Sequence, residues 1–136
     1  MTTSQRDGTM IDKLAQFDLF KEIADSEQNK PWQSGHSAKT LFKKHDLRVV
    51  LITMQDGARM KEHHADGTTS IHVLKGNIRV TLHGQSHDLG VGNLLTLAAS
   101  IRHDVEAAGG DAAFLLTISW PSSENLAAMK HRGYGA

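Results

Sequence analysis

Histidine is the residue type in this sequence that is best suited to chemistry. The chain has nine histidines, and two of them, His63 and His64, are adjacent in a segment bounded by Gly57 and Gly76. A third, His103, follows a largely apolar segment. Imidazole binds metal ions and also acts as a general acid or base near neutral pH. These three histidines are therefore candidates for a binding or catalytic site.

The rest of the composition excludes several kinds of chemistry. Cysteine is absent, so a thiolate nucleophile, a disulfide and cysteine-ligated zinc are all excluded. No glycine-rich phosphate loop lies between a strand and a helix, and spacing alone assembles no nucleophile, base and orienting acid. Fifteen basic residues balance fifteen acidic ones, which argues against a nucleic-acid partner.

The chain also has no sequence signal for a membrane or for secretion. Its N-terminus has no apolar core of signal-peptide length, and no apolar run is long enough to span a bilayer. We therefore expect a cytoplasmic protein without a membrane partner. With 136 residues, 39% of them hydrophobic and 22% charged, the chain fits one globular domain that buries a core of its own.

Short strand patterns follow one another along most of the chain. Residues 47–54 are almost wholly apolar and rich in β-branched side chains, which is typical of a strand covered on both faces. Residues 70–75 and 77–83 are strand-like on either side of Gly76, and we expect them to form one hairpin. Further strands are predicted at 38–43, 86–89, 94–98, 103–107 and 113–120.

Helical patterns occur near the two ends of the chain. Residues 10–23 carry apolar side chains at three- to four-residue spacing, which indicates an amphipathic helix, and residues 121–136 contain the pattern of a short terminal helix. Many short strands between glycine turns predict an all-β antiparallel sandwich, jelly roll or barrel. One face of the last strand is interpreted as core and carries Phe114, Leu116, Ile118 and Trp120.

The segment that ends at His103 resembles the second sequence motif of the cupin superfamily, G-x5-P-x-G-x2-H-x3-N. The spacing from Gly92 to His103 matches the motif. Ala98 and Ser100 stand where the family has proline and glycine, and Ala107 stands where it has asparagine. The histidine is therefore the chemically important residue of this motif that is kept.

The first cupin motif, G-x5-H-x-H-x3or4-E-x6-G, fits the chain in two registers. Both end at Gly76 and both place Thr69 where the family has its metal-binding glutamate. The register that keeps Gly57 and His63 is preferred because it preserves two fixed points of the motif. In this register the second histidine of the motif has become alanine.

The other register pairs Glu62 with His64 and loses the initial glycine. Neighbouring residues of a strand point to opposite sides, so His63 and His64 cannot both face one cavity. The choice between the two registers stays open. The resemblance covers about residues 47–118, as judged by motif spacing and strand pattern.

The resemblance implies a jelly-roll β-barrel and, since dimers are common among cupins, a homodimer. The implied organisation is an N-terminal extension with a helix at 1–36, a cupin β-barrel at 37–120, and a tail with a short helix at 121–136. The implied cavity residues are His63, Thr69 and His103. The implied ligands of a divalent iron, manganese, nickel or zinc ion are His63, His64 and His103.

Three functions agree with these residues. The leading hypothesis is a cupin that binds a small molecule in the barrel cavity with a reduced metal site, because the family's metal-binding carboxylate is replaced by Thr69. The first alternative is a metal-dependent oxygenase or isomerase that acts on a small organic substrate. The second is a metal-free enzyme that uses His103 or His63 as its acid or base.

Overall fold

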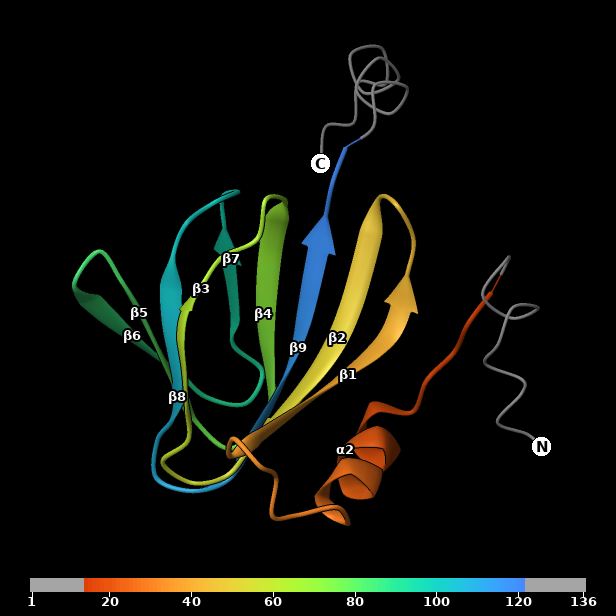
Figure 1. The fold of residues 1–136 in the computed structure, drawn as a ribbon, viewed down its shortest axis with the longest axis vertical. Coiled ribbons are helices and arrows are strands. Elements are labelled where there is room, and N and C mark those ends of the chain that lie inside the picture. The colour runs from red at the N-terminus through yellow and green to blue at the C-terminus, as the bar shows by residue number, and fades with distance from the viewer. Residues whose placement is uncertain (1–13, 122–136) are drawn as a thin grey trace.

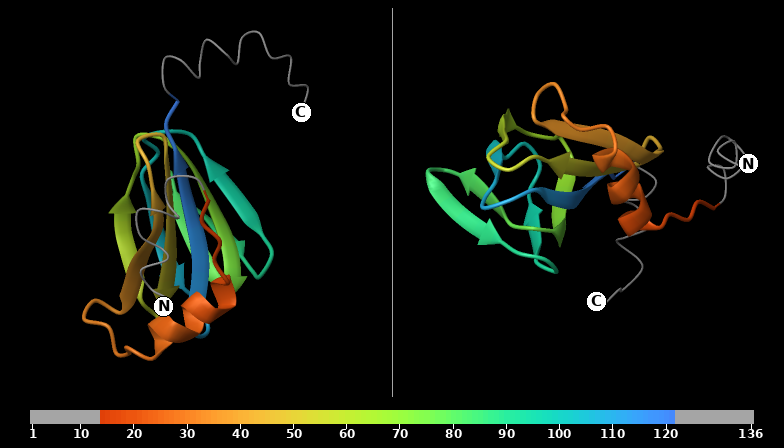
Figure 2. Two further views of the ribbon diagram at one scale, coloured as in Figure 1. Left: turned by 90° about the vertical axis from the view of Figure 1, so that its right-hand side faces the viewer. Right: turned by 90° about the horizontal axis from the view of Figure 1, so that it is seen from below.

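Two antiparallel β-sheets packed face to face form the body of the protein (Figures 1 and 2). The computed structural model describes residues 14–121, with the side chains of Glu62 and His63 left out. The first sheet has the strand order β1 (His36–Lys43), β2 (Leu47–Met54), β9 (Ala112–Ser119), β4 (Thr68–Lys75) and β7 (Leu94–Leu97). The second has the order β3 (Arg59–His63), β8 (His103–Ala107), β5 (Ile78–Leu82) and β6 (Gln85–Leu89).

The predicted antiparallel jelly-roll fold is confirmed. No strand pairing closes the two sheets into a continuous barrel within residues 14–121, so the fold is an open sandwich of the jelly-roll type. The predicted division into residues 1–36, 37–120 and 121–136 stays a prediction. The predicted C-terminal helix falls almost wholly outside the described residues.

The apolar core lies between the two sheets because strand alternation turns every second side chain inward. Strand β2 shows why its sequence is apolar throughout. One face packs into the core, while Leu51 on the other face is covered by helix α2. The core cluster consists of Val50, Ile52, Met54, Ile71, Val73, Ile78, Val80, Leu97, Val105, Ala107, Ala112 and Phe114.

Helix α2 (Leu19–Glu27) packs on the outside of the five-stranded sheet (Figure 2). The Asp18 side chain caps it by accepting a hydrogen bond from the Lys21 backbone N–H at 3.2 Å. Ile23 is buried against the sheet, but Phe20 is 68% exposed. The helix predicted at 10–23 is wrong for residues 14–18, which are not helical, and residues 10–13 lie outside the described part of the chain. The predicted apolar face is only partly a packing face, because Phe20 points away from the sheet. No helix among residues 14–121 is long and apolar enough to cross a membrane.

The predicted hairpin across Gly76 is wrong. Strand β4 belongs to the five-stranded sheet and pairs with β7 and β9, whereas β5 belongs to the other sheet and pairs with β6 and β8. The chain makes a sharp corner between them at Gly76, whose φ is +70°. A Cβ there would lie 2.2 Å from the Asp111 carbonyl oxygen, so the corner requires glycine. The hairpin of this region is β5–β6.

Strand β3 is not among the strands predicted from the sequence, because it lacks a regular apolar alternation. It pairs only with β8 in the described structure, and the register shifts along the pair. Met60 lies opposite Val105 and His63 lies opposite His103. Between these two pairs the chain advances by three positions on β3 but by only two on β8. This extra residue breaks strict alternation just before the adjacent histidines.

Candidate functional site

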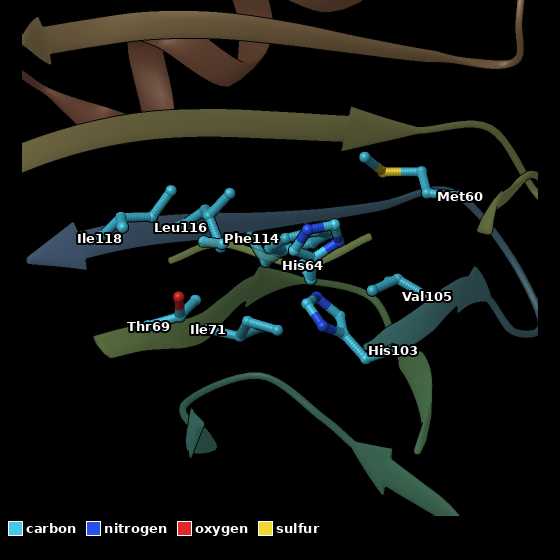
Figure 3. A pocket seen from close by; sticks show the side chains of 10 residues that line it. Met60, His64, Thr69, Ile71, His103, Val105, Phe114, Leu116 and Ile118 are labelled. Carbon is cyan, nitrogen blue, oxygen red and sulfur yellow. The ribbon is translucent and has the colours of Figure 1, made fainter. Parts of the chain in front are cut away.

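A cavity of about 180 Å³ lies between the sheets, with residues of β3, β4, β8 and β9 around it. It extends to the end of the sandwich where β4 and β8 begin and β9 ends, which is the upper end in Figure 1. Figure 3 shows the side chains that project into it. The lining residues are Met60, His64, Ala65, Thr69, Ile71, His103, Val105, Phe114, Leu116 and Ile118.

His103 lines the cavity as the first residue of β8 and is only 8% exposed. Its Nδ1 lies 3.1 Å from the carbonyl oxygen of Ile101. A carbonyl oxygen can only accept, so Nδ1 carries the proton in this hydrogen bond. The neutral ring is then left with a lone pair on Nε2, which can accept a proton or a hydrogen bond from a ligand.

His64 also lines the cavity but is exposed, so it lies at the solvent-facing boundary. Figure 3 shows its ring projecting into the same cavity as that of His103. His64 begins the β3–β4 loop, and the next residue, Ala65, accepts a backbone hydrogen bond from Ser100 at 2.6 Å. This bond ties the loop that carries His64 to the loop that precedes His103.

The far side of the same loop is held against the end of β9. The Trp120 indole N–H donates to the Asp66 carboxylate at 2.7 Å. This hydrogen bond holds the pKa of the Asp66 carboxyl below its ordinary value. Gly67 packs so closely that a Cβ there would lie 2.5 Å from the carbonyl oxygen of Ser119.

Thr69 is buried and lines the cavity, at the position where the cupin motif has its glutamate. Its hydroxyl donates to the Gly67 carbonyl oxygen at 3.2 Å. The hydroxyl proton is therefore used to hold the loop, and only the oxygen lone pairs are left for a ligand. The prediction that Thr69 binds a ligand stays a prediction, although its place in the cavity wall agrees with it.

The inner face of β9 was interpreted from the sequence as core with one end at the cavity mouth; its side chains do pack in the core, but more of them line the cavity than that interpretation expected. Phe114, Leu116 and Ile118 all face the cavity, whereas Trp120 lies beyond the end of the strand. Alternation correctly predicts that these residues share one face. It cannot tell a filled interior from an interior that leaves room for a ligand.

The structure places the backbone of His63 opposite His103 in the β3–β8 pair. The His63 side chain lies outside what is described, so its predicted roles in the cavity and in metal binding stay predictions. The register shift between Met60 and His63 explains why counting along the sequence cannot decide which histidine faces inward. The sequence left open whether His63 or His64 faces the cavity, and the structure places His64 in the cavity lining.

The described donor atoms do not make a metal site. Among the described residues there is no group of three or more histidine, aspartate or glutamate side chains that could hold a metal ion. Two imidazoles and a threonine hydroxyl provide no anionic ligand, and protein sites for divalent transition metals ordinarily use at least three protein ligands. We therefore derive no chemical step through a metal.

The fold and the cavity together define a small β-sandwich protein with a ligand-sized interior. The family model of the cupin domain matches residues 50–119, and the chain belongs to the cupin family. No curated protein matches the chain.

Solved structures with the same fold come from proteins of different descriptions. A conserved protein of unknown function from Streptococcus pyogenes is 20% identical with a TM-score of 0.66, and the match covers 80% of this chain and 90% of that one. KdgF from Halomonas sp. is 21% identical with a TM-score of 0.59, with 70% and 87% covered. An HTH_3 family transcriptional regulator from Vibrio cholerae is 24% identical with a TM-score of 0.59, with 74% and 60% covered. These likenesses show the fold alone.

Proposed function

We propose that the protein binds a small, largely apolar molecule in the cavity between the sheets, with the polar end of the molecule at His64 and His103. The observation that carries this proposal is a mainly apolar cavity into which two imidazole rings project. Ligand sites in proteins commonly combine an apolar lining with a few polar groups that orient the ligand. This cavity has that composition.

The size of the cavity limits the ligand. Its volume of about 180 Å³ is below the range of roughly 300–1,000 Å³ that is common for drug-sized ligands. It is close to the roughly 150 Å³ of an apolar cavity that accepts benzene. The best fit is therefore one ring, or a short branched chain, with a single polar group.

The two histidines determine which polar group is favoured. With Nδ1 of His103 bound to the Ile101 carbonyl, the neutral ring accepts a hydrogen bond at Nε2 and favours a hydroxyl group. When an imidazole is protonated, both nitrogens are donors, and a carboxylate or phenolate is favoured instead. A phenol or an aromatic acid matches both the apolar walls and this polar end.

Titration of benzene, phenol and benzoate into isotope-labelled protein, followed by NMR, tests the proposal. We expect saturable shifts for cavity residues, with phenol or benzoate bound more tightly than benzene. His103→Leu should weaken phenol and benzoate binding by about tenfold, which corresponds to the loss of one charged or well-placed hydrogen bond. Benzene binding should stay within about twofold of wild type, because it makes no polar contact.

A steric variant separates cavity binding from surface binding. Leu116→Phe adds volume inside the cavity and should abolish binding of all three compounds, whereas Leu14→Phe makes the same change at a residue that is 68% exposed. Binding that survives Leu116→Phe, or an absence of saturable binding for all three compounds, contradicts the proposal.

A second candidate function is acid–base catalysis without a metal, and the hydrogen bond of His103 favours it. The Ile101 carbonyl orients the ring and leaves Nε2 as the basic atom in a cavity that is largely screened from water. Proton exchange at the methyl group of a keto acid is a direct test. Pyruvate in D2O should lose its methyl proton signal faster with wild type than with His103→Asn, and equal rates for the two proteins reject this function for keto acids.

A further inference from the structure

A second hollow lies at the same end of the molecule, outside the cavity described above. This groove has a volume of about 750 Å³ and is open to solvent. Figure 1 shows the three segments that meet here: the β1–β2 turn, the β3–β4 loop and the end of β9. The lining residues are Lys43, Lys44, His45, Arg48, Asp66 and Trp120.

The walls of the groove are fixed by hydrogen bonds of the main chain and of Trp120. The β1–β2 turn is closed by the Lys44 N–H, which donates to the Leu47 carbonyl at 2.8 Å. The Trp120 N–H donates to the Asp46 carbonyl at 2.9 Å, and the Trp120 indole N–H donates to Asp66 at 2.7 Å. The three segments are thus linked through the residue that follows β9.

The charges of the groove do not balance. Three cations, Lys43, Lys44 and Arg48, face one carboxylate, Asp66. Within residues 14–121, neither lysine forms an ion pair, and the Asp66 carboxylate already accepts the indole N–H. Among the side chains that line the groove, three positive charges and one negative charge leave a surplus of two positive charges, in a chain whose formal net charge is zero.

Arg48 is the cation whose position is most restricted. Its guanidinium carbon lies over the Trp120 ring, 5.5 Å from the ring centre, which is within the range of a cation–π interaction. Its Nε is buried and has no hydrogen-bond partner among the described atoms. A guanidinium held in this way presents its donors in a fixed arrangement that suits the oxygens of a planar or tetrahedral anion.

We propose that this groove is a second binding site, for a phosphate group that is either free or carried by a small organic molecule. Arg48 and the two nearby lysines supply the positive charge, and Trp120 forms the wall with which Arg48 makes a cation–π contact. A phosphate dianion matches the surplus of two positive charges and offers several acceptor oxygens to the guanidinium and ammonium groups. This site is independent of ligand binding in the cavity.

Calorimetric titration of the full chain with inorganic phosphate and with phenyl phosphate at low ionic strength tests the assignment. We expect saturable binding with a dissociation constant at or below about 1 mM. Lys43→Gln with Lys44→Gln should weaken it by at least about tenfold, because two charge-assisted contacts are lost. The matched control is Lys21→Gln with Lys61→Gln, which removes the same charge from exposed lysines elsewhere and should change binding by less than about twofold.

The remaining outcomes separate the alternatives. Tighter binding of phenyl phosphate than of inorganic phosphate assigns the site to an organic phosphate, while equal binding assigns it to the free anion. The cavity variant Leu116→Phe should bind phosphate as wild type does, whatever it does to apolar ligands. An absence of saturable binding, an equal loss in the control variant, or a loss in Leu116→Phe would overturn the proposal.

Discussion

Gly67 is the residue that lets the His64 loop lie against the end of β9. Its role is steric, since no bulkier residue fits the available space. A Cβ would lie 2.5 Å from the Ser119 carbonyl oxygen and 3.0 Å from both the Ile118 side chain and the Trp120 indole nitrogen. The main chain at the end of a hydrogen-bonded strand is costly to displace. A Cβ at position 67 would therefore displace the loop instead.

We expect Gly67→Ala to lower the free energy of unfolding by about 1–3 kcal/mol, because overpacking a fitted contact costs that much. The His64 resonances should shift in NMR spectra, since the loop that carries this residue is displaced. Urea unfolding followed by circular dichroism measures the first effect. Thr68→Ala, at the exposed neighbouring position, should cost less than about 1 kcal/mol. Equal stability of Gly67→Ala and wild type would show that the loop adapts freely.

Ile23 is the buried apolar side chain through which helix α2 packs on the sheet, and two ion pairs, Glu22–Lys39 and Glu27–Lys75, also join the helix to the sheet. Ile23 is 5% exposed and packs with Leu41, Leu51 and Ala113 on the outer face of the five-stranded sheet. Phe20 on the same helix is 68% exposed. Truncation of these two residues therefore separates packing against the sheet from the intrinsic helix preference.

Ile23→Ala should destabilise the protein by about 2–4 kcal/mol, the usual cost of removing a large buried aliphatic side chain. Phe20→Ala should change stability by no more than about 0.5 kcal/mol, because its side chain is largely in water already. Both changes in the free energy of unfolding are measured from the midpoints of denaturant unfolding curves, with the same denaturant slope for each variant. A cost of less than 1 kcal/mol for Ile23→Ala would mean that α2 contributes little to the folded state.

The start of β9 is tied to two other segments through Asp111. Its carboxylate accepts the Lys30 ammonium and, at 2.9 Å, the Asp56 backbone N–H. The Lys30 hydrogen bond, followed by the Asp56 hydrogen bond, holds the pKa of Asp111 below its ordinary value of 3.8. A carboxyl whose pKa is lowered on folding stabilises the protein above its unfolded pKa and loses this effect as pH falls through the folded pKa.

Asp111→Asn should therefore be less stable than wild type at neutral pH, by about 1 kcal/mol or less because the pair is partly exposed. The difference should disappear at pH values well below 3.8. Thermal unfolding of wild type, Asp111→Asn, Lys30→Gln and the double variant across this pH range forms a double-mutant cycle. The cycle measures the coupling free energy between Lys30 and Asp111. A difference that is independent of pH would contradict the ionic explanation.

The whole molecule presents several large apolar side chains to solvent in the described structure. The most exposed are Leu14, Phe20, Val91 and Leu94. Leu94 lies on β7, one of the two edge strands of the five-stranded sheet, and is 61% exposed. The resemblance to cupins predicts a homodimer, and an exposed apolar edge agrees with that prediction.

Sedimentation velocity should give twice the chain mass of 14.9 kDa. Leu94→Lys should move the distribution toward the monomer, whereas Gln85→Lys on β6 of the other sheet should not. A monomer at all concentrations would reject the homodimer, and a dimer unaffected by Leu94→Lys would place the contact elsewhere.

Most of the strands, and the burial of their faces, follow from local pattern. The apolar run at 47–54 is β2 with the predicted bounds, and the alternating segment at 113–120 is β9 to within one residue at each end. Successive side chains of any strand point to opposite faces because of the backbone geometry alone. Which residues share a face can therefore be predicted from the sequence. His103 was found by its place in the second cupin motif, and the structure puts it at the start of β8 with its side chain lining the cavity.

Two of the missed features depend on contacts between distant segments. The chain turns at Gly76 between β4 and β5, which lie in different sheets, and the turn requires glycine because a Cβ there would meet the main chain at Asp111. The register shift in β3 breaks the alternation that would have told His63 from His64. Neither is visible in a local pattern, since strand-like residues look the same whichever strand lies beside them.

The sequence by itself therefore determined the cupin fold, the inward-facing sides of most strands and the importance of His103, because each depends on a short-range repeat or a motif. Only the tertiary structure decided that His64 lines the cavity, that β9 leaves room for a ligand, and that residues 43–48 meet Asp66 and Trp120 in a charged groove. These outcomes are set by which strands pair and by how completely two sheets fill the space between them. Pairing and filling are properties of the whole chain and not of any segment.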